Sequence, residues 1–404
     1  MKKRLAIGLF TLIPTLGWAV DDVPLPADCV TKLRTQAIEA GVTGDFFDAT
    51  LSTVQAKPEL LEKLNYQPEF KLPIWDYLAS LVDEERVRDG QVMLIQYKAA
   101  LEQISRTYGV DPETIVAVWG VESNYGQNTG GRDIVESLAT LSCMGRRQSF
   151  FSKELVAAIK ILESGDFERD LFKGSWAGAF GQTQFMPTTF LRLARDGDND
   201  GKRNLITNAI DALASTAHFL QKAGWRSGDV WGFEVALRNG TEPAVVGRRS
   251  PKDMSYWVAQ GIRRVDGRPL IAGNITANTD AALLLPAGPT GPAFLLLNNF
   301  KAIYSYNASE SYGLAIAHLS DRLRGAALFQ TPWPTDDPGL SRAEKREIQT
   351  HLLRRGHDIG VVDGALGSRS RAAIELEQAR LGHPVNGRAG QRLLEALRNS
   401  QSAQ

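Results

Sequence analysis

The residue types best suited to catalysis fall in one short stretch, residues 118–126, which reads VWGVESNYG. Just upstream, Asp111 is a good N-cap and Pro112 suits the first helical position, so a helix is expected to begin there. This helix is apolar on every side up to Glu122, which predicts that it is buried. Gly126 suits a C-terminal stop, so Glu122 should lie near the end of a buried helix.

A carboxyl group at this place is disfavoured as an anion for two reasons. Apolar surroundings remove its water, and the negative end of the helix dipole repels its charge. Both effects raise the pKa of Glu122 above the reference value of about 4.3. A protonated Glu at neutral pH can act as a general acid. The alternative is a structural Glu that is buried and paired with an arginine from elsewhere in the chain.

A second unusual stretch, residues 174–187, interleaves glycines with aromatic and amide side chains. Such a sequence suits neither a regular helix nor a regular strand. Its glycines would let a ligand approach the backbone, and Ser175 and Gln184 would offer neutral hydrogen bonds. The alternative is a tightly packed structural loop that binds no ligand.

A third stretch resembles the start of an EF-hand calcium loop. Asp196, Asp198 and Asp200 stand at loop positions one, three and five, and a glycine follows at position six. The twelfth position is Thr207 instead of the usual Glu, but Asp211 lies a little further on and could supply the missing oxygen from a longer loop. The alternative is an acidic, Asx-rich turn without an ion.

The N-terminus reads as an export signal rather than as part of the fold. Three basic residues, 2–4, precede an apolar run over residues 5–16, and small residues before Val20 suit a cleavage site, which gives a signal peptide over residues 1–19. The apolar run is too short for a membrane anchor. No cysteine lies at the cleavage point, so lipid anchoring is not expected. The sequence therefore predicts a periplasmic protein without a transmembrane segment.

The two cysteines, Cys29 and Cys143, suit an oxidising compartment. An even count permits one disulfide, which would tie the N-terminal segment to the region after the Glu122 helix. The alternative is two buried free thiols, since sequence alone does not give the separation of their Cα atoms.

Length and composition limit the remaining choices. A chain of 404 residues can hold two or more domains with a large core, and 43% hydrophobic and 23% charged residues are ordinary for a globular protein. The formal net charge is zero, so nucleic acid is not expected as a partner.

Helical spacing of apolar residues predicts helices through most of residues 22–110, 132–163, 211–223 and 312–324. Residues from about 236 to 299 change character, with glycine, proline and short β-prone runs, and predict a small β-containing insertion. Residues 331–339 form a linker by composition. The tail, 340–404, contains a near repeat, in which residues 363–367 (DGALG) are echoed by 386–390 (NGRAG), and predicts a compact helical bundle.

These motifs together resemble, in order and spacing, those of the B-type lytic murein transglycosylases from about Cys29 to Leu323. The matching motifs are residues 119–126, Ala139–Leu141 with Arg146 and Arg147, residues 174–187, the Asp196 loop, and Tyr306 with Asn307. The tail resembles a peptidoglycan-binding module of the three-helix type. It departs from that module at Glu377, where an aromatic residue is usual.

The resemblance implies a mainly α fold: a lysozyme-like core with an N-terminal helical region and the β-containing insertion, over residues 20–330. The small three-helix module would follow the linker. Family members cleave the β-1,4 bond between N-acetylmuramic acid and N-acetylglucosamine and leave a 1,6-anhydro ring. By motif match, Glu122 is the catalytic carboxyl. The expected substrate-binding residues are Ser123, Tyr125, Ser175, Gln184, Tyr306 and Asn307.

Ordinary glycosidases need two carboxyl groups, whereas here one Glu would act first as acid and then as base, with help from the substrate. No cofactor is required for this chemistry, and calcium would be structural. Peptidoglycan strands are the expected partner, with wall-synthesis proteins as further candidates. One alternative is a hydrolytic muramidase that uses Glu136 or Asp133 to activate water. Another is a non-catalytic protein that binds the wall through its tail.

Overall fold

The structure, a computed structural model, describes residues 23–64, 71–238 and 243–400. The predicted signal peptide lies outside the described residues. The fold is mainly α, as the sequence predicts, with small antiparallel sheets. Within the described ranges, none of the helices has both the length and the apolar character that crossing a membrane requires.

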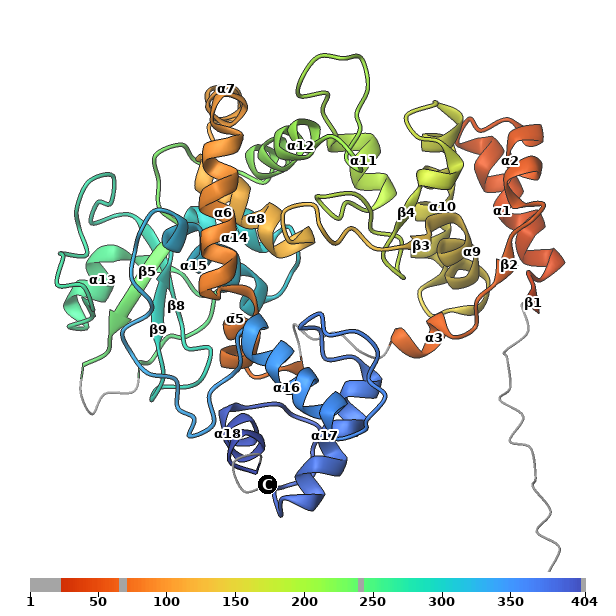
Figure 1. Ribbon diagram of the computed structural model, residues 1–404. Helices are drawn as coiled ribbons and strands as arrows, with labels where there is room; N and C mark the ends of the chain where they lie inside the picture. Colours follow the sequence, from red (N-terminus) through yellow and green to blue (C-terminus); the bar gives the residue numbers. More distant parts are fainter. Residues whose placement is uncertain (1–22, 65–70, 239–242, 401–404) are drawn as a thin grey trace, which may run out of the picture.

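The N-terminal helices pack beside two later helices, and together they form one hydrophobic core (Figure 1). The elements are β1 (Val23–Pro24), α1 (Ala27–Glu39), α2 (Gly44–Leu51), β2 (Gln55–Ala56), α3 (Leu60–Lys63), α9 (Ile134–Met144) and α10 (Gln148–Glu163). Cys29 of α1 is joined to Cys143 of α9 by a disulfide, with their Cα atoms 5.7 Å apart. The sequence left this bond open, and it fastens the N-terminal segment to α9.

A second core surrounds α8 (Pro112–Ser123), the helix that carries Glu122. Helices α6 (Glu84–Gln96), α7 (Lys98–Tyr108), α12 (Ala209–Lys222) and α15 (Glu310–Leu323) pack against it. Helices α5 (Ile74–Leu81) and α14 (Asn298–Tyr304) also contribute to this core. In contrast, α11 (Pro187–Leu193) packs on α10 in the first core, and β3 (Arg132–Asp133) lies beside α9 and pairs with β4 (Lys173–Gly174), which follows a 3-10 turn (Arg169–Leu171). Residues 115–120 are all buried, as their apolar character predicts.

The predicted insertion is a five-stranded antiparallel sheet in the order β6-β8-β9-β5-β7. Its elements are β5 (Gly232–Ala236), β6 (Lys252–Asp253), α13 (Met254–Ala259), β7 (Arg263–Arg264), β8 (Asp280–Leu284) and β9 (Ala293–Leu296). The central register pairs Leu295 with both Phe233 and Leu283. The sheet begins at Gly232, before the expected boundary at about 236, because its first strand directly follows the buried Trp231.

The C-terminal module has the three helices that the sequence predicts: α16 (Arg342–Arg354), α17 (Ser368–Arg380) and α18 (Gln391–Asn399). The two halves of its near repeat also form matching turns in the structure. Buried Gln349 accepts a hydrogen bond from the amide of Gly364 at 2.7 Å, and buried Gln378 accepts one from the amide of Gly387 at 2.9 Å. Each repeated turn is thus held by a glutamine from the helix before it.

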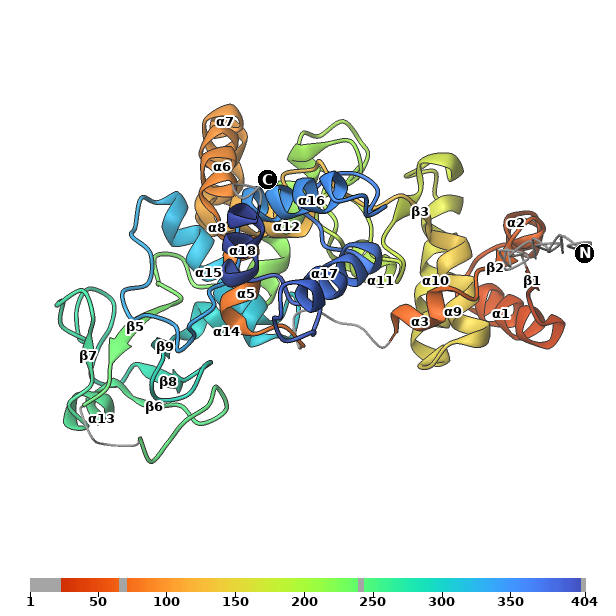
Figure 2. The ribbon, with the colours of Figure 1, turned by 60° about the horizontal axis from the view of Figure 1, so that its bottom comes forward.

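The segment between the two domains is bound along the protein surface. The backbone amides of Gln330 and Thr331 donate to the carboxylate of Glu234 at 2.8 and 2.7 Å. At the other end, a Cβ added to Gly339 would lie 2.7 Å from the Cα of Asp76, so only glycine fits there. The module lies against α5 and α6, through ion pairs of Arg388 with Asp76 and of Arg346 with Glu85, and it is drawn below α5 in Figure 1 and beside these helices in Figure 2.

Candidate active site

Glu122 occupies the last turn of α8, where the sequence places it. Asp111 caps the helix by accepting a hydrogen bond from the Thr114 amide at 3.2 Å, and Pro112 is its first residue. The helix ends earlier than expected: Asn124, with φ of 50°, is its C-cap, and Gly126 lies beyond it. Asparagine tolerates the left-handed conformation well enough to end a helix in place of glycine. Glu122 is half-buried, as is Val121 directly before it, while residues 114–120 are buried.

A tyrosine holds the carboxyl group of Glu122. The hydroxyl of Tyr312, in the first turn of α15, donates a hydrogen bond to Glu122 Oε1. Tyr306 lies parallel to Tyr312, with ring centroids 6.4 Å apart, and its hydroxyl donates to the carbonyl oxygen of Thr183 at 2.8 Å. Burial raises the pKa of both tyrosines well above the usual value, and the charge of Glu122 raises it further. Both hydroxyls are therefore neutral donors at physiological pH.

The residues that directly follow Glu122 are turned into the protein. The buried Ser123 hydroxyl donates to the carbonyl of Gln182 at 2.7 Å and accepts from the amide of Gly126 at 3.0 Å. The buried Tyr125 hydroxyl donates to the carbonyl of Arg86 at 2.7 Å. These contacts give Ser123 and Tyr125 a supporting role, and the geometry does not favour the direct contact with sugar that was expected of them.

The glycine-rich stretch 174–187 packs against α8 and α9 as a tight loop. A Cβ at Gly174 would lie 2.2 Å from the carbonyl oxygen of Ala179, and one at Gly178 would lie 2.4 Å from Leu138. These glycines thus allow close packing, as in the structural alternative, and contact between this loop and a ligand stays a prediction. Gln182 of this loop accepts a hydrogen bond from the indole of Trp119 at 3.0 Å, which fastens the loop to the Glu122 helix.

The other predicted substrate-binding residues, in and around this loop, are partly exposed. Ser175 Oγ accepts from the amide of Ala179 at 3.0 Å, and Gln184 Nε2 donates to the carbonyl oxygen of Gly181 at 2.8 Å. Asn307 is partly exposed directly after Tyr306. The sequence missed Tyr312 as a site residue, because a tyrosine at the start of an amphipathic helix gives no local signal of what its hydroxyl contacts.

The acidic loop gathers three carboxylates, but not the expected three. Ligand atoms of Asp196, Asp198 and Asp211 all lie within 4.8 Å of one another, whereas Asp200 is not part of this cluster. Asp200 instead accepts a hydrogen bond from the amide of Lys202. This cluster supports the expectation that Asp211 could complete the loop, and the ligand role of Asp200 stays a prediction.

Asp211 is fully buried at the start of α12. It accepts from the amides of Gly197 at 2.7 Å and Asn204 at 2.6 Å. Burial raises its pKa to about 6; the two amide bonds oppose that change, and the charges of Asp198 and Asp196 add to it. A buried carboxylate beside two others suits a hard cation that prefers oxygen ligands, such as calcium.

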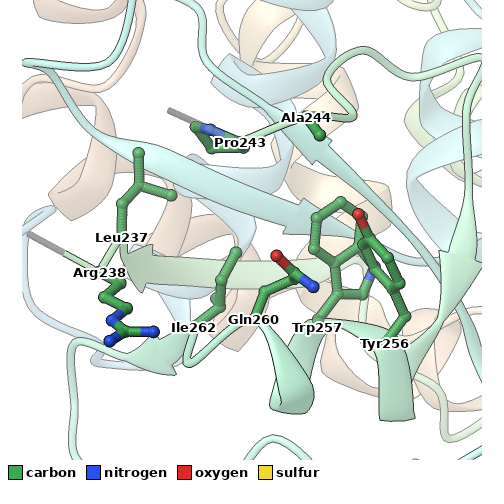
Figure 3. Close-up of a pocket in the computed structure, with 8 residues that line it drawn as sticks. All are labelled: Leu237, Arg238, Pro243, Ala244, Tyr256, Trp257, Gln260 and Ile262. Atoms are coloured by element: carbon green, nitrogen blue, oxygen red, sulfur yellow. The ribbon is translucent and has the colours of Figure 1, made fainter. Parts of the chain in front are cut away.

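Two hollows differ greatly in size. A groove of about 1010 Å³ opens beside the end of α8, between Asn124, Gln127 and Asn128 on one side and the C-terminal module on the other. The hollow beside Trp257 and Tyr256 in the insertion has only about 20 Å³, which is room for a single water molecule (Figure 3). A third hollow, of about 780 Å³, is lined by residues such as Arg268, Asn274 and Asp280 and includes no residue of α8. The groove of about 1010 Å³ is the one that adjoins the end of the Glu122 helix, and it has room for part of a glycan strand.

Comparison with known proteins places this geometry in a family. Residues 26–321 match the transglycosylase SLT domain, and residues 341–397 match a putative peptidoglycan binding domain. The chain belongs to the lytic transglycosylases of the SLT-domain family. The resemblance to B-type lytic murein transglycosylases, the lysozyme-like fold and the peptidoglycan-binding tail are thereby confirmed.

Individual relatives share most of the architecture. SltB3 from Pseudomonas aeruginosa, solved with NAG-anhNAM-pentapeptide, is 42% identical with a TM-score of 0.73 over 92% of this chain and 98% of that one. The Escherichia coli lytic transglycosylase Slt35, solved with calcium, is 28% identical with a TM-score of 0.65 over 78% of this chain and 98% of that one. Membrane-bound lytic murein transglycosylase B of Escherichia coli is 34% identical over 247 residues, which span 60% of this chain and 65% of that relative.

Proposed function

We propose that the protein cleaves peptidoglycan glycan strands at the β-1,4 bond between N-acetylmuramic acid and N-acetylglucosamine, with Glu122 as the single catalytic carboxyl. The observation that carries the proposal is the position of Glu122, half-buried at the end of an apolar helix and held by the neutral hydroxyl of Tyr312. A neutral donor orients the carboxyl without the cationic charge that would hold it ionised.

The reaction runs in two proton transfers. Protonated Glu122 gives its proton to the glycosidic oxygen as the bond from that oxygen to the muramic acid C1 breaks, and the N-acetyl group stabilises the sugar cation. The Glu122 carboxylate then takes the proton of the sugar's own 6-hydroxyl while this oxygen bonds to C1. The product is a 1,6-anhydro ring, and the intramolecular nucleophile has a large effective concentration compared with water.

The hydrolytic alternative needs a second carboxylate that is available to activate water. Asp133 is already engaged, because it caps α9 by accepting from the Glu136 amide at 2.8 Å and forms an ion pair with Arg169. This argues against Asp133 as the base that activates water; Glu136, half-buried in α9, remains the residue that a hydrolytic route would use. Ser175, Gln184, Tyr306 and Asn307 remain the proposed residues around the sugars, and the module is proposed to bind the same strands.

Digestion of purified peptidoglycan by wild type and Glu122→Gln, followed by mass spectrometry, tests the proposal. We expect anhydro ends from the wild type and a loss of turnover with retained wall binding for the variant. Products that have gained water would favour the muramidase. Full activity of Glu122→Gln would remove Glu122 from the catalytic role.

We further propose a structural calcium ion at Asp196, Asp198 and Asp211. Calcium should raise the melting temperature of wild type, magnesium should raise it less, and Asp196→Ala should abolish the calcium response while leaving the chemistry of Glu122 in place. Asp200→Ala is the matched control, since Asp200 lies outside the cluster. Equal melting temperatures with calcium and with chelator would disprove the site.

Periplasmic location by way of the predicted signal peptide is also part of this proposal. The sequence of the mature N-terminus, beginning at Val20, together with its release from cells by osmotic shock, would support it. The Escherichia coli relative is named membrane-bound, so retention in the membrane fraction is the competing outcome. Crosslinking in the released fraction would show whether wall-synthesis proteins bind.

A further inference from the structure

One arginine of the C-terminal module is buried against the catalytic domain. Arg342, the first residue of α16, has a side chain only 13% exposed, and that of its partner Asp83 is 3% exposed. Arg342 Nε donates to Asp83 Oδ2 at 2.9 Å, and Nη2 donates to Oδ1 at 3.2 Å. A bidentate arginine–carboxylate pair at this depth fixes one relative geometry of its two partners.

Asp83 extends this contact into the catalytic domain. It caps α6 by accepting from the amide of Arg86 at 2.8 Å. The buried guanidinium of Arg86 crosses to α8 and donates to the carbonyl oxygen of Gly120, while the Tyr125 hydroxyl donates to the carbonyl of Arg86. Gly120 and Tyr125 lie on either side of Glu122 in the sequence, so Arg86 holds the chain both before and after it.

Arg342 also reaches the end of α8 directly. Its Nη1 donates to Oδ1 of Asn124, the residue whose left-handed conformation ends the helix. A second atom of that amide is fixed too, because Asn124 Nδ2 donates to Gln127 at 2.9 Å. The module therefore holds the helix cap next to Glu122 by a side-chain contact, in addition to the route through Asp83.

Other contacts of the module end elsewhere. Arg346 pairs with Glu85 of α6 at 2.5 Å, and Arg388 pairs with Asp76 of α5 at 2.7 Å. These pairs dock the module on α5 and α6, whereas Arg342 joins it to the helix that carries the carboxyl. The contacts that dock the module on α5 and α6 are therefore different from the contact that reaches the α8 helix.

We infer that Arg342 is a positioning residue for the reaction of Glu122, so that the docked module contributes to turnover itself and not only to wall binding. The inference rests on the proposed catalytic role of Glu122. Loss of Arg342 frees the cap of α8 and leaves Asp83 with one cationic neighbour fewer. Small displacements of a reacting group cost rate steeply, on the order of a hundredfold for about 1 Å.

The test measures kcat and KM on a soluble, uncrosslinked glycan fragment of a few disaccharides, so that binding to intact wall does not enter. Arg342→Ala should lower kcat by about tenfold or more and change KM by less than about twofold, as expected for a misplaced group. Arg398→Ala should stay within about twofold of wild type in kcat, because it removes only an exposed ion pair with Glu347 inside the same module, and neither residue lines the groove.

Arg342→Lys separates positioning from stability. A lysine can pair with Asp83 but lacks the planar fork needed to reach Asn124 at the same time. We therefore expect Arg342→Lys to regain most of the melting temperature lost in Arg342→Ala while kcat stays low. If Arg342→Ala does not fold, Asn124→Gly removes the contact from the other side, because glycine keeps the left-handed cap; the same fall in kcat is expected.

The outcomes distinguish this inference from the proposed function. An unchanged kcat in folded Arg342→Ala, or in Asn124→Gly, beside an inactive Glu122→Gln, would overturn the positioning role and leave the catalytic role intact. Recovery of kcat in parallel with melting temperature in Arg342→Lys would make Arg342 merely structural. Activity in Glu122→Gln would instead overturn the proposed function.

Discussion

At the scale of single residues, the Glu122 carboxyl and the Tyr312 hydroxyl form the central pair of the site. Tyr312 comes from α15, far along the chain, and its buried ring cannot easily reorient. A hydrogen bond from a neutral group fixes one carboxyl oxygen and leaves the proton available for transfer. Whether this bond contributes to catalysis can be tested by removing one oxygen atom.

Tyr312→Phe keeps the ring and deletes the donor. We expect kcat to fall by about ten- to a hundredfold and KM to change little, because Glu122 becomes a carboxylate as it gives up its proton and a hydrogen bond to a charged group contributes roughly 1.5–3 kcal/mol. Steady-state kinetics on soluble glycan fragments measures both. Tyr256→Phe, in the insertion, is the control and should behave as wild type. A Tyr312→Phe enzyme with wild-type kcat would show that the carboxyl needs no such donor.

The sequence was informative about Glu122 because every signal for it is local. A cap, a proline at the first helical position and a run of apolar residues predict a buried helix with one carboxyl at its end. The roles of Tyr312 and Arg86 could not be predicted from the sequence, since each residue contacts the α8 region from a distant segment of the chain. Asp211 lies between these cases: the sequence named it as a possible further ligand of the acidic loop, and the fold places its carboxylate beside those of Asp196 and Asp198.

At the scale of elements, α15 carries a second buried group that titrates. His318 is stacked on Phe329, with ring centroids 3.8 Å apart. Burial lowers the pKa of His318 to about 3, and the charge of Arg322 lowers it further. The folded value lies below the unfolded value of about 6.5, so the unfolded chain binds more protons between these two values. The stabilising effect is complete above pH 6.5 and is lost as the pH falls.

This histidine should give the free energy of unfolding a measurable slope in acid. Its contribution falls by about 1.4 kcal/mol per pH unit below pH 6.5, which is roughly 2 kcal/mol between pH 7 and pH 5. Urea denaturation of wild type and His318→Gln at both pH values should show their difference shrinking by this amount. His383→Gln, a partly exposed histidine in the module, is the control. A constant difference between wild type and His318→Gln would contradict the assignment.

Helix positions were more predictable than helix ends and loops. The C-terminus of α8 was placed at Gly126 because glycine is the usual stop, yet Asn124 ends the helix, held by Gln127 and by Arg342 of the module. The glycines of residues 174–187 suggested an open loop for a ligand, whereas the structure uses several of them to pack backbone against side chains. Tertiary contacts decide such cases, and no local pattern reports them.

At the scale of the whole molecule, the composition of residues 331–339 predicts a linker, but it does not predict that this linker is held against the catalytic domain. Arg388 of the module shows how the parts are joined. It donates through Nε and Nη2 to the two carboxylate oxygens of Asp76 at 2.7 and 2.8 Å, and it also pairs with Asp337 of the linker. One guanidinium thus ties module, linker and α5 together, which argues against two freely moving domains.

The joined parts should unfold together, and Arg388→Ala should separate them. Removing one partner of a largely buried ion pair costs roughly 3 kcal/mol or more, because Asp76 is left without its cation. We expect one calorimetric transition for wild type and two for Arg388→Ala, with the module melting first and the radius of gyration from X-ray scattering increased.

Arg398→Ala is the control for this prediction. It removes an exposed pair with Glu347 inside the module and should keep the single transition, since such pairs contribute about 1 kcal/mol at most. Two transitions already in wild type would mean that the ion pairs hold the module in place without coupling its stability to that of the catalytic domain.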